Sequence, residues 1–229
     1  MQQSAFHRLV PVYARASVGE SSAASRRAAL FCAAMPAAPK TTDAEIVRAA
    51  RKLVEARGQD GFSMNDVAAA VGIRAPSLYG RFADRAALLA AVELEVWRAL
   101  ERAIARAPRS PDPLETLMAQ CRAYRAFAKA HPESYALVYD ANAERTEEGM
   151  RARAAALAPT MPAFAALVGE HDALLAARTL VPFLHGFVSM DLSGAFRLGG
   201  RLDQAFEHGV RTILSGLGGI HARRAGRRG

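Results

Sequence analysis

Apolar residues recur at helical spacing in the segment 41–58. They fall at i, i+4, i+7 and i+8 and so lie on one face of a helix: Ile46, Ala50, Leu53 and Val54. Thr42 and Glu45 have the spacing of a capping box, which satisfies free amides at a helix start. Gly58 can close the other end, so the pattern predicts one capped helix. Three basic residues of this helix are expected to face solvent: Arg48, Arg51 and Lys52.

Three further helices are predicted before residue 107. Ser63 and Asp66 have a second capping-box spacing, and Gly72 ends the short helix that follows and permits a tight turn. Pro76 is tolerated only in the first turn of a helix, so the third helix begins near it. Asp84 then caps a fourth, longer helix. The apolar face of this helix consists of Leu88, Val92, Val96, Leu100 and Ile104.

The second half of the chain is also predicted to be helical. Pro108, Pro111 and Pro113 interrupt the pattern and mark the best internal boundary. Beyond them, helical segments are expected at residues 114–130, 132–140, 144–157, 171–198 and 202–217. Pro159 and Pro162 predict a loop. No segment alternates apolar and polar residues between turn signals as a strand would, so the sequence predicts an all-α fold.

The segment 63–82 has the features of a helix-turn-helix. Its two short helices are joined by the turn at Gly72, and apolar residues lie where the helices must meet: Val67, Val71, Ile73 and Leu78. Ala68 is small, as required where the next helix passes close to it. Such a unit places its second helix in the major groove of DNA. The helices predicted on both sides extend the match.

Residues 40–100 resemble the DNA-binding domain of the TetR-type transcriptional regulators. The resemblance rests on the capped first helix and on the stretches "GFSMNDVAAAVGI", "SLYGRF" and "FADRAALLAAV". Residues 108–220 resemble the effector-binding and dimerising half of that family, and "HPESYALVY" and "FLHGFVSMDLSGAF" resemble its WHG-type subgroup. Val181 stands where that subgroup has a tryptophan, one turn before His185. The resemblance implies a three-helix DNA-binding domain with a helix-turn-helix, followed by a helical domain for ligand binding and dimerisation.

The resemblance also implies which residues contact double-stranded DNA. The first residues of the recognition helix are expected in the major groove: Arg74, Ala75, Pro76 and Ser77. The arginine among them pairs with guanine or contacts phosphate. Tyr79 resembles the family tyrosine whose hydroxyl contacts a phosphate, and Arg81 and Arg85 flank it. Thr42 and Ser63 lie at helix starts, where hydroxyl and amide groups suit phosphate. The alternative for these residues is structural: helix caps, a core tyrosine and solvated charges.

In the same family the helices of the second half enclose an effector pocket. The candidates for this pocket are Cys121, Tyr124, Phe127, Phe183 and His185, and the alternative is that they are ordinary core. The helices 171–198 and 202–217 are expected to form a four-helix bundle with a second copy of the chain. A homodimer matches a palindromic operator, whose half-sites would lie about 34–36 Å apart. Pro182 is expected to kink the first of these two helices.

The composition excludes several classes of protein but does not indicate a function. The 229 residues, 51% of them hydrophobic, can form a sizeable core, and no run of 18 apolar residues predicts a membrane span. Cys32 and Cys121 provide neither a disulfide framework nor a metal-ligand spacing, so no cofactor or metal is expected, and a bacterial cytoplasm is the expected location. The net charge of +8 comes mainly from the two ends, so it is weak evidence for nucleic acid.

The two ends of the chain differ from the rest. Residues 1–39 are rich in Ala, Ser and Arg, and are expected to be a disordered arm or the product of a start placed before Met35. A transit-type segment has a similar composition and is the alternative. The basic tail 221–229 is expected to be disordered, with non-specific attraction to DNA as the alternative.

Three functions are compared. The first is a ligand-responsive transcriptional regulator, a repressor released from a palindromic operator by a small-molecule effector. The second is a helical enzyme with Cys121 as nucleophile and His131 or His185 as base, but Cys121 lies in mid-helix on an apolar stripe. The third is a helix-turn-helix module that binds proteins and not DNA. Because groove-facing polar groups such as Arg74 and Ser77 are present, the sequence favours the regulator and no enzymatic activity.

Overall fold

The computed structural model describes residues 41–139 and 146–225, which lie in one compact unit and include no strand. The α-helices are α2 (Asp43–Arg57), α3 (Met64–Ala70), α4 (Ala75–Tyr79), α5 (Arg85–Ala105), α6 (Pro113–Ala130), α7 (Pro132–Val138), α8 (Glu147–Leu157), α9 (Met161–Val168), α10 (Glu170–Leu192) and α11 (Leu202–Ala225); a short 3-10 helix, η1 (Ala158–Thr160), precedes α9. The expected all-α fold is confirmed. The expectations for residues 1–39 and for the end of the basic tail lie outside the described residues.

Helices α2 and α3 begin at the two predicted capping boxes. The Thr42 amide donates to Glu45 Oε2 at 2.7 Å, and the Glu45 amide donates to the Thr42 hydroxyl at 3.3 Å. Ser63 and Asp66 form the same two bonds at 2.7 and 3.3 Å. Each box satisfies amides that have no partner inside the helix, which explains why the helices start at these residues.

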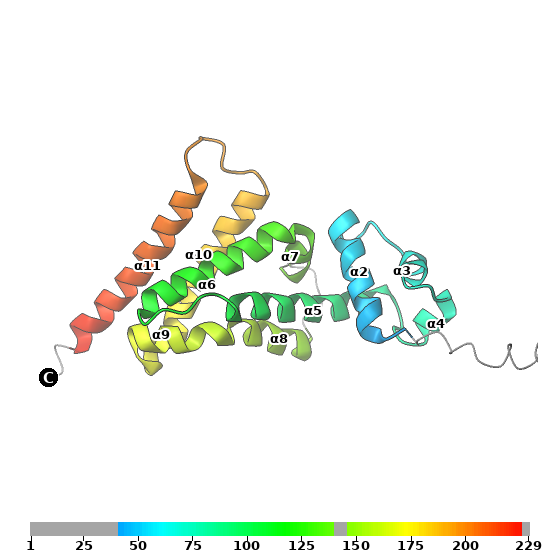
Figure 1. Ribbon diagram of the computed structural model, residues 1–229, viewed down its shortest axis with the longest axis horizontal. Helices are drawn as coiled ribbons and strands as arrows, with labels where there is room; N and C mark the ends of the chain where they lie inside the picture. The colour runs from blue at the N-terminus through cyan, green and yellow to red at the C-terminus, as the bar shows by residue number, and fades with distance from the viewer. Residues whose placement is uncertain (1–40, 140–145, 226–229) are drawn as a thin grey trace, which may run out of the picture. The chain divides into compact units, whose positions relative to one another are not determined.

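Helix α5 connects the two halves of the fold. It begins at Asp84, whose carboxylate accepts from the Ala87 amide at 2.8 Å. It packs against α2 and against α6, α7 and α8 (Figure 1). Its predicted apolar face is buried at every position: Leu88, Val92, Val96, Leu100 and Ile104. A single rigid element therefore runs from the helix-turn-helix into the second half.

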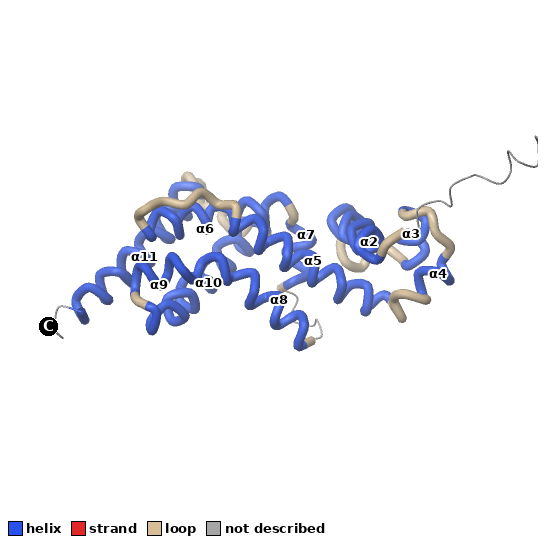
Figure 2. The backbone as a smooth tube through the Cα atoms, turned by 60° about the horizontal axis from the view of Figure 1, so that its bottom comes forward, coloured by secondary structure: helices blue, strands red, loops and turns tan. Residues whose placement is uncertain are grey.

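Helices α6 to α11 make up that second half. Helices α10 and α11 form a hairpin joined by residues 193–201 (Figures 1 and 2), and both pack against α6 and α9. Helix α8 and η1 lie against α5. The core of this half therefore lies between α5, α6, α9 and α10.

The structure corrects three predicted boundaries. The expected loop at Pro159 and Pro162 is η1 followed by α9, because each proline lies in a first turn, where a missing N–H costs nothing. Helix α10 ends at Leu192 and not at residue 198, since Gly194 with φ of +66° soon follows. Helix α11 continues to Ala225, beyond the expected end at residue 217.

Among the described residues, α10 is long and apolar enough to span a membrane by length and composition alone. One of its faces lies in the protein core, at Ala173, Ala176, Ala177, Leu180, Leu184 and Val188. Core helices of soluble proteins pass the same test, so this property is weak evidence for insertion. Pro182 lies on the exposed side, and the helix continues through it. The predicted kink at this residue stays a prediction.

Candidate DNA-binding surface and interior cavity

The turn between α3 and α4 determines where α4 lies. Gly72 has φ of +69°, a left-handed conformation that favours glycine. The Ile73 amide then donates to the Ala68 carbonyl at 3.0 Å, which folds the chain back toward α3. Leu78 is 0% exposed and anchors α4 in the core. Because a helix of five residues is not stable alone, these contacts are what hold α4 in place.

Helix α4 and its N-cap carry the polar groups predicted to face DNA. Arg74, Pro76 and Ser77 are exposed, and Ala75 is half-buried. Tyr79 is 51% exposed, so the alternative of a core tyrosine does not apply to it. Within the described residues, the structure gives no hydrogen-bond or ion-pair partner to the side chains of Arg74 and Tyr79. Both groups are therefore available to an external partner.

Arg81 and Arg85, which flank the recognition helix, are already engaged inside the protein. Arg81 donates to the Thr41 carbonyl and to Asp43 Oδ1, the latter at 3.2 Å. Arg85 Nε donates to the Phe62 carbonyl at 3.3 Å, and its guanidinium lies 5.0 Å from the Phe62 ring centre. These bonds tie the segment after α4 to the start of α2 and to the loop before α3. A phosphate contact from either arginine would compete with them.

The two residues predicted to contact phosphate at helix starts also act as helix caps in this structure, and their phosphate contacts stay predictions. The hydroxyls of Thr42 and Ser63 donate to Glu45 Oε2 at 3.0 Å and to Asp66 Oδ2 at 2.6 Å. Hydrogen bonds from the backbone and side chain of Thr42 lower the pKa of Glu45, and those from Ser63 lower the pKa of Asp66. Both carboxylates are therefore ionised at neutral pH and would repel a phosphate placed on the same hydroxyl.

Arg51 corrects an expectation about α2. Arg48 and Lys52 are exposed as expected, but Arg51 is half-buried. Its guanidinium lies 5.8 Å from the Phe127 ring centre and 4.0 Å from Glu95 Oε1. Burial lowers its pKa, although the nearby carboxylate opposes this effect. Arg51 therefore joins α2 to α5 and α6.

Glu55 makes a second connection between α2 and the other half. Its two carboxylate oxygens accept from the amides of Glu133 and Ser134, each at 3.2 Å. These amides belong to the first turn of α7, where they have no partner within the helix. A carboxylate of the half that contains the helix-turn-helix thus caps a helix of the second half.

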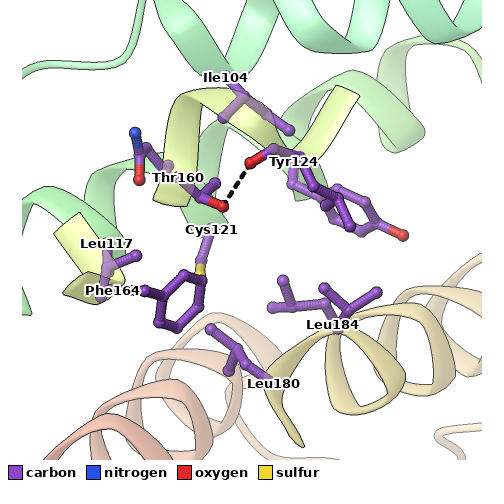
Figure 3. Close-up of a pocket in the computed structure, with 11 residues that line it drawn as sticks. Ile104, Leu117, Cys121, Tyr124, Thr160, Phe164, Leu180 and Leu184 are labelled. Carbon is purple, nitrogen blue, oxygen red and sulfur yellow. Dashed lines mark hydrogen bonds between the residues drawn. The ribbon is translucent and has the colours of Figure 1, made fainter. Parts of the chain in front are cut away.

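A mostly apolar cavity lies between α5, α6, α9 and α10 (Figure 3). Its wall includes Ile104, Leu117, Cys121, Phe164, Leu180 and Leu184. The centre of a water-sized sphere can occupy about 20 Å³ of this cavity, which is enough for about one water molecule. A larger molecule would fit only if side chains of the wall moved.

Two of the five residues predicted for an effector pocket line this cavity. Cys121 and Tyr124 belong to its wall, whereas Phe127, Phe183 and His185 do not. Phe127 packs against His131, and Phe183 packs against Phe187. Apolar periodicity identified the right helix faces, but it gave no signal for the wall residues supplied by α9 and by the end of α8.

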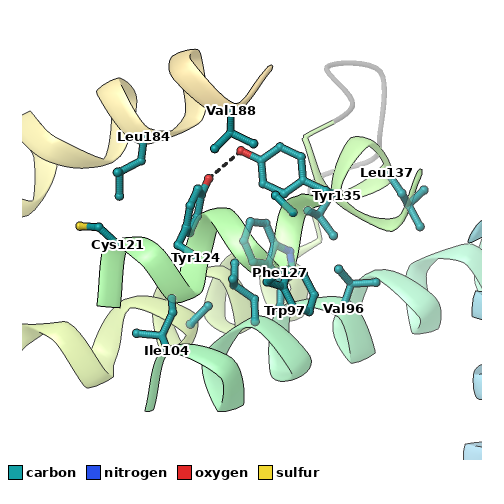
Figure 4. Packing of buried hydrophobic residues seen from close by; sticks show 14 of the residues in the cluster. Val96, Trp97, Ile104, Cys121, Tyr124, Phe127, Tyr135, Leu137, Leu184 and Val188 are labelled. Carbon is teal, nitrogen blue, oxygen red and sulfur yellow. Dashed lines mark hydrogen bonds between the residues drawn. The ribbon is translucent and has the colours of Figure 1, made fainter. Parts of the chain in front are cut away.

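Tyr124 belongs to a hydrogen-bonded aromatic network, part of which is shown in Figure 4. Its hydroxyl lies 2.7 Å from that of Tyr135 and 3.0 Å from that of Tyr139. The Tyr135 hydroxyl lies 2.8 Å from His185 Nδ1, and the His185 ring stacks on Tyr139. Burial raises the pKa of Tyr124 and lowers that of His185. His185 is half-buried and has a hydrogen-bond partner inside the protein, and its predicted contact with an effector stays a prediction.

The structure does not support Cys121 as a nucleophile. Burial raises the pKa of its thiol to about 12, so the thiolate is scarce at neutral pH. His185 is hydrogen-bonded to Tyr135, and His131 packs on Phe127, so neither is paired with the thiol. Among the described residues, no group of three or more His, Cys, Asp and Glu has the arrangement of a metal site.

Comparisons with known proteins match both halves of the chain. A family model described as bacterial regulatory proteins of the tetR family matches residues 46–92, and one described as a tetracyclin repressor-like C-terminal domain matches residues 117–213. Together they cover more than half of the chain. A comparison with curated proteins found no match.

Three similar solved structures share the fold. A protein of unknown function from Rhodococcus sp. RHA1 is 25% identical, with a TM-score of 0.64 over 81% of this chain and 100% of that chain. A possible TetR family transcriptional regulator from Streptomyces coelicolor A3(2) is 23% identical, with a TM-score of 0.57 over 78% and 100%. A single-residue variant of TetR from Acinetobacter baumannii AYE, in complex with minocycline, is 20% identical, with a TM-score of 0.59 over 80% and 99%.

The family models, the helix-turn-helix geometry and the helical second half agree with one another. TetR-family regulators bind DNA operators and small-molecule effectors as dimers, and are generally not enzymes. The chain belongs to the TetR family and is a DNA-binding transcriptional regulator.

Proposed function

We propose that this regulator is a homodimeric repressor that binds a palindromic operator in the cytoplasm and leaves it when a small molecule enters the second half. The observation that carries the proposal is the group of exposed side chains on α4 and its N-cap, a helix held in place by the core. Two of these side chains, Arg74 and Tyr79, have no partner within the described residues. In this proposal residues 40–100 bind DNA, and residues 108–220 bind the effector and dimerise.

The exposed residues of α4 suit two kinds of DNA contact. Arg74 and Ser77 stand at the N-terminal end of the helix, which enters the major groove in helix-turn-helix proteins. Tyr79 lies at the C-terminal end of α4, and its hydroxyl can donate a hydrogen bond to a phosphate. Arg81 and Arg85 support this arrangement by positioning α4, and a direct phosphate contact from either would be additional.

Exposed apolar side chains on α10 and α11 support dimerisation. Leu174, Leu175, Met190 and Leu192 are exposed on α10, and Ile220 is exposed on α11. Large exposed apolar side chains on two adjacent helices are typical of a protein interface. A second copy would cover them in a two-fold arrangement, which matches a palindromic operator.

The interior cavity supports an effector role for the second half. The similar TetR variant from Acinetobacter baumannii contains minocycline, and a different molecule is proposed for this chain because its own cavity is small and apolar. The cavity is bounded by α5, which also contacts α2. Expansion of the cavity would shift α5 and thereby change the distance between the two recognition helices of a dimer.

Single substitutions on α4 test the DNA contacts. Arg74→Ala is expected to weaken operator binding by about 1–3 kcal/mol and to relax the preference at one base pair. Tyr79→Phe is expected to weaken binding by about 1 kcal/mol for every sequence, because it removes one phosphate hydrogen bond. Affinities are measured by fluorescence anisotropy at one fixed salt concentration. The control is Arg151→Ala on α8, an exposed arginine whose loss should leave operator affinity unchanged. Equal losses in all three variants would contradict these assignments.

Glu55 tests the connection between the two halves. Glu55→Ala is expected to lower the free energy of unfolding by about 1–2 kcal/mol, because two amides at the start of α7 lose their partner. Glu55→Gln retains one acceptor and should lose less. Urea unfolding measures both effects, and hydrogen exchange should be faster at the Ser134 amide. An alanine variant with unchanged stability and unchanged exchange would show that the connection contributes nothing.

A further inference from the structure

Gln120 of α6 is a polar residue buried next to the interior cavity. It is 4% exposed. Its Nε2 donates to the Pro159 carbonyl at 2.9 Å, whereas its Oε1 is buried and has no hydrogen-bond partner among the described residues. Turning the amide round would place two oxygens against each other, so Oε1 is the atom left unpaired. Buried acceptors usually have a donor, so this oxygen can accept from a molecule outside the chain.

The other polar groups of the cavity wall are already used. The Thr160 hydroxyl donates to the Leu157 carbonyl at 2.7 Å, and the Tyr124 hydroxyl is bonded to two other tyrosines. The Cys121 thiol is buried and uncharged. The rest of the wall is aliphatic or aromatic. Gln120 Oε1 is therefore the unused hydrogen-bonding atom at this site within the described residues.

Gln120 also borders a second, more open pocket. The centre of a water-sized sphere can occupy about 220 Å³ of this outer pocket. The pocket lies between the loop before α6 and the prolines at the start of η1 and α9. Its wall includes Arg109, Pro111, Thr116, Pro159 and Pro162. The Thr116 hydroxyl accepts from the Ser110 amide at 2.9 Å and so holds the loop in place. Gln120 is the residue that the outer pocket and the interior cavity share.

We propose that the effector is a small, uncharged molecule with an apolar body and one hydrogen-bond donor. It enters through the outer pocket, donates to Gln120 Oε1 and places its apolar body in the interior cavity, which widens around it. A hydroxyl or an amide N–H satisfies the oxygen, whereas a carboxylate offers only acceptors and would be repelled. The inference rests on the proposed function, because it assumes that a ligand acts at this cavity.

Matched probes test the inference on the full-length chain. 4-Ethylphenol and 4-methylanisole are isomers of which the first has a donor and the second has none, as are 1-hexanol and 1-methoxypentane, and binding is measured by isothermal titration calorimetry. Each donor probe is expected to bind about ten-fold more tightly than its ether, which is the ratio that one hydrogen bond provides. Equal binding within a pair, or no binding by any of the four, would overturn the inference.

Two variants identify the atom responsible. Gln120→Met keeps the length of the side chain and removes the acceptor, so it should reduce the ten-fold preference to less than about two-fold. Arg109→Ala changes another outer-pocket residue and should keep the preference. A Gln120→Met protein that retains the full preference would overturn the assignment. If that variant does not fold, the comparison of probes on the wild-type chain still decides.

Operator binding without any probe separates this inference from the proposed function. A wild-type chain that binds its operator but shows no preference for donors overturns only the inference about Gln120. A chain that binds no operator overturns the proposed function itself.

Discussion

Replacing Arg125 by alanine is expected to lower the free energy of unfolding by about 3 kcal/mol, because it leaves a buried carboxylate without its main partner. The Arg125 side chain is 10% exposed and that of Asp191 is 11% exposed. Arg125 Nη2 donates to Asp191 Oδ2 at 2.8 Å, and its Nη1 donates to Asp203 at 2.7 Å. The guanidinium also lies 4.9 Å from the Phe206 ring centre. One side chain of α6 thus holds both arms of the α10–α11 hairpin.

The size of this loss depends on what remains near Asp191. Lys129 Nζ lies 3.8 Å from the same carboxylate and compensates in part, which sets the expected loss at the low end of the range for buried pairs. Arg122→Ala is the matched control, one turn earlier on α6. Arg122 forms an exposed two-bond pair with Glu207 at 2.6 Å, so its loss should cost about 1 kcal/mol or less.

Urea unfolding followed by circular dichroism measures both variants, at one protein concentration because the proposed dimerisation would make stability depend on concentration. Losses of equal, small size in Arg125→Ala and Arg122→Ala would contradict the buried role of Arg125.

Leu78→Ala is expected to lower the free energy of unfolding by about 3 kcal/mol and to abolish specific operator binding. Leu78 is 0% exposed and is the buried residue of α4. Its loss leaves a cavity under the recognition helix, and the five residues of that helix do not persist without tertiary contacts. The polar side chains on α4 would then no longer be held in the fixed positions that specific DNA contacts require.

The neighbouring residue provides the control for this prediction. Tyr79→Phe changes an exposed side chain, so unfolding should change by less than about 0.5 kcal/mol while operator affinity falls. Thermal unfolding and operator binding are measured on both variants. The interpretation of α4 is wrong if Leu78→Ala retains full operator affinity, or if Tyr79→Phe unfolds as readily as Leu78→Ala.

Local signals allowed the sequence to predict the helix-turn-helix well. Thr42 with Glu45, Ser63 with Asp66, and the turn at Gly72 act over a few residues, so their spacing alone identified the helix starts and the turn. The buried face of α5 followed from periodicity for the same reason. The exposure of Tyr79 could not be read from its spacing, because it depends on how α4 packs.

Features that depend on tertiary contacts were predicted less well. Pro162 indicates a loop or the first turn of a helix, and only packing of α9 decides between them. Arg51 was expected in solvent because it is charged, yet its guanidinium lies over the Phe127 ring. No sequence pattern singles out Gln120, because an unpaired acceptor is defined by the atoms around it and not by its spacing in the sequence.

The central claim is specific DNA recognition by α4, and a binding titration tests it most directly. The purified protein is titrated against the intergenic DNA upstream of its own gene and against random DNA of equal length, at one stated salt concentration. We predict that the wild-type chain binds the upstream DNA at least about 10³-fold more tightly than random DNA. The double variant Arg74→Ala with Tyr79→Phe should lose about 10²-fold of that affinity. The account would be contradicted if the wild-type chain bound the upstream DNA no more tightly than random DNA and the double variant bound with the same affinity.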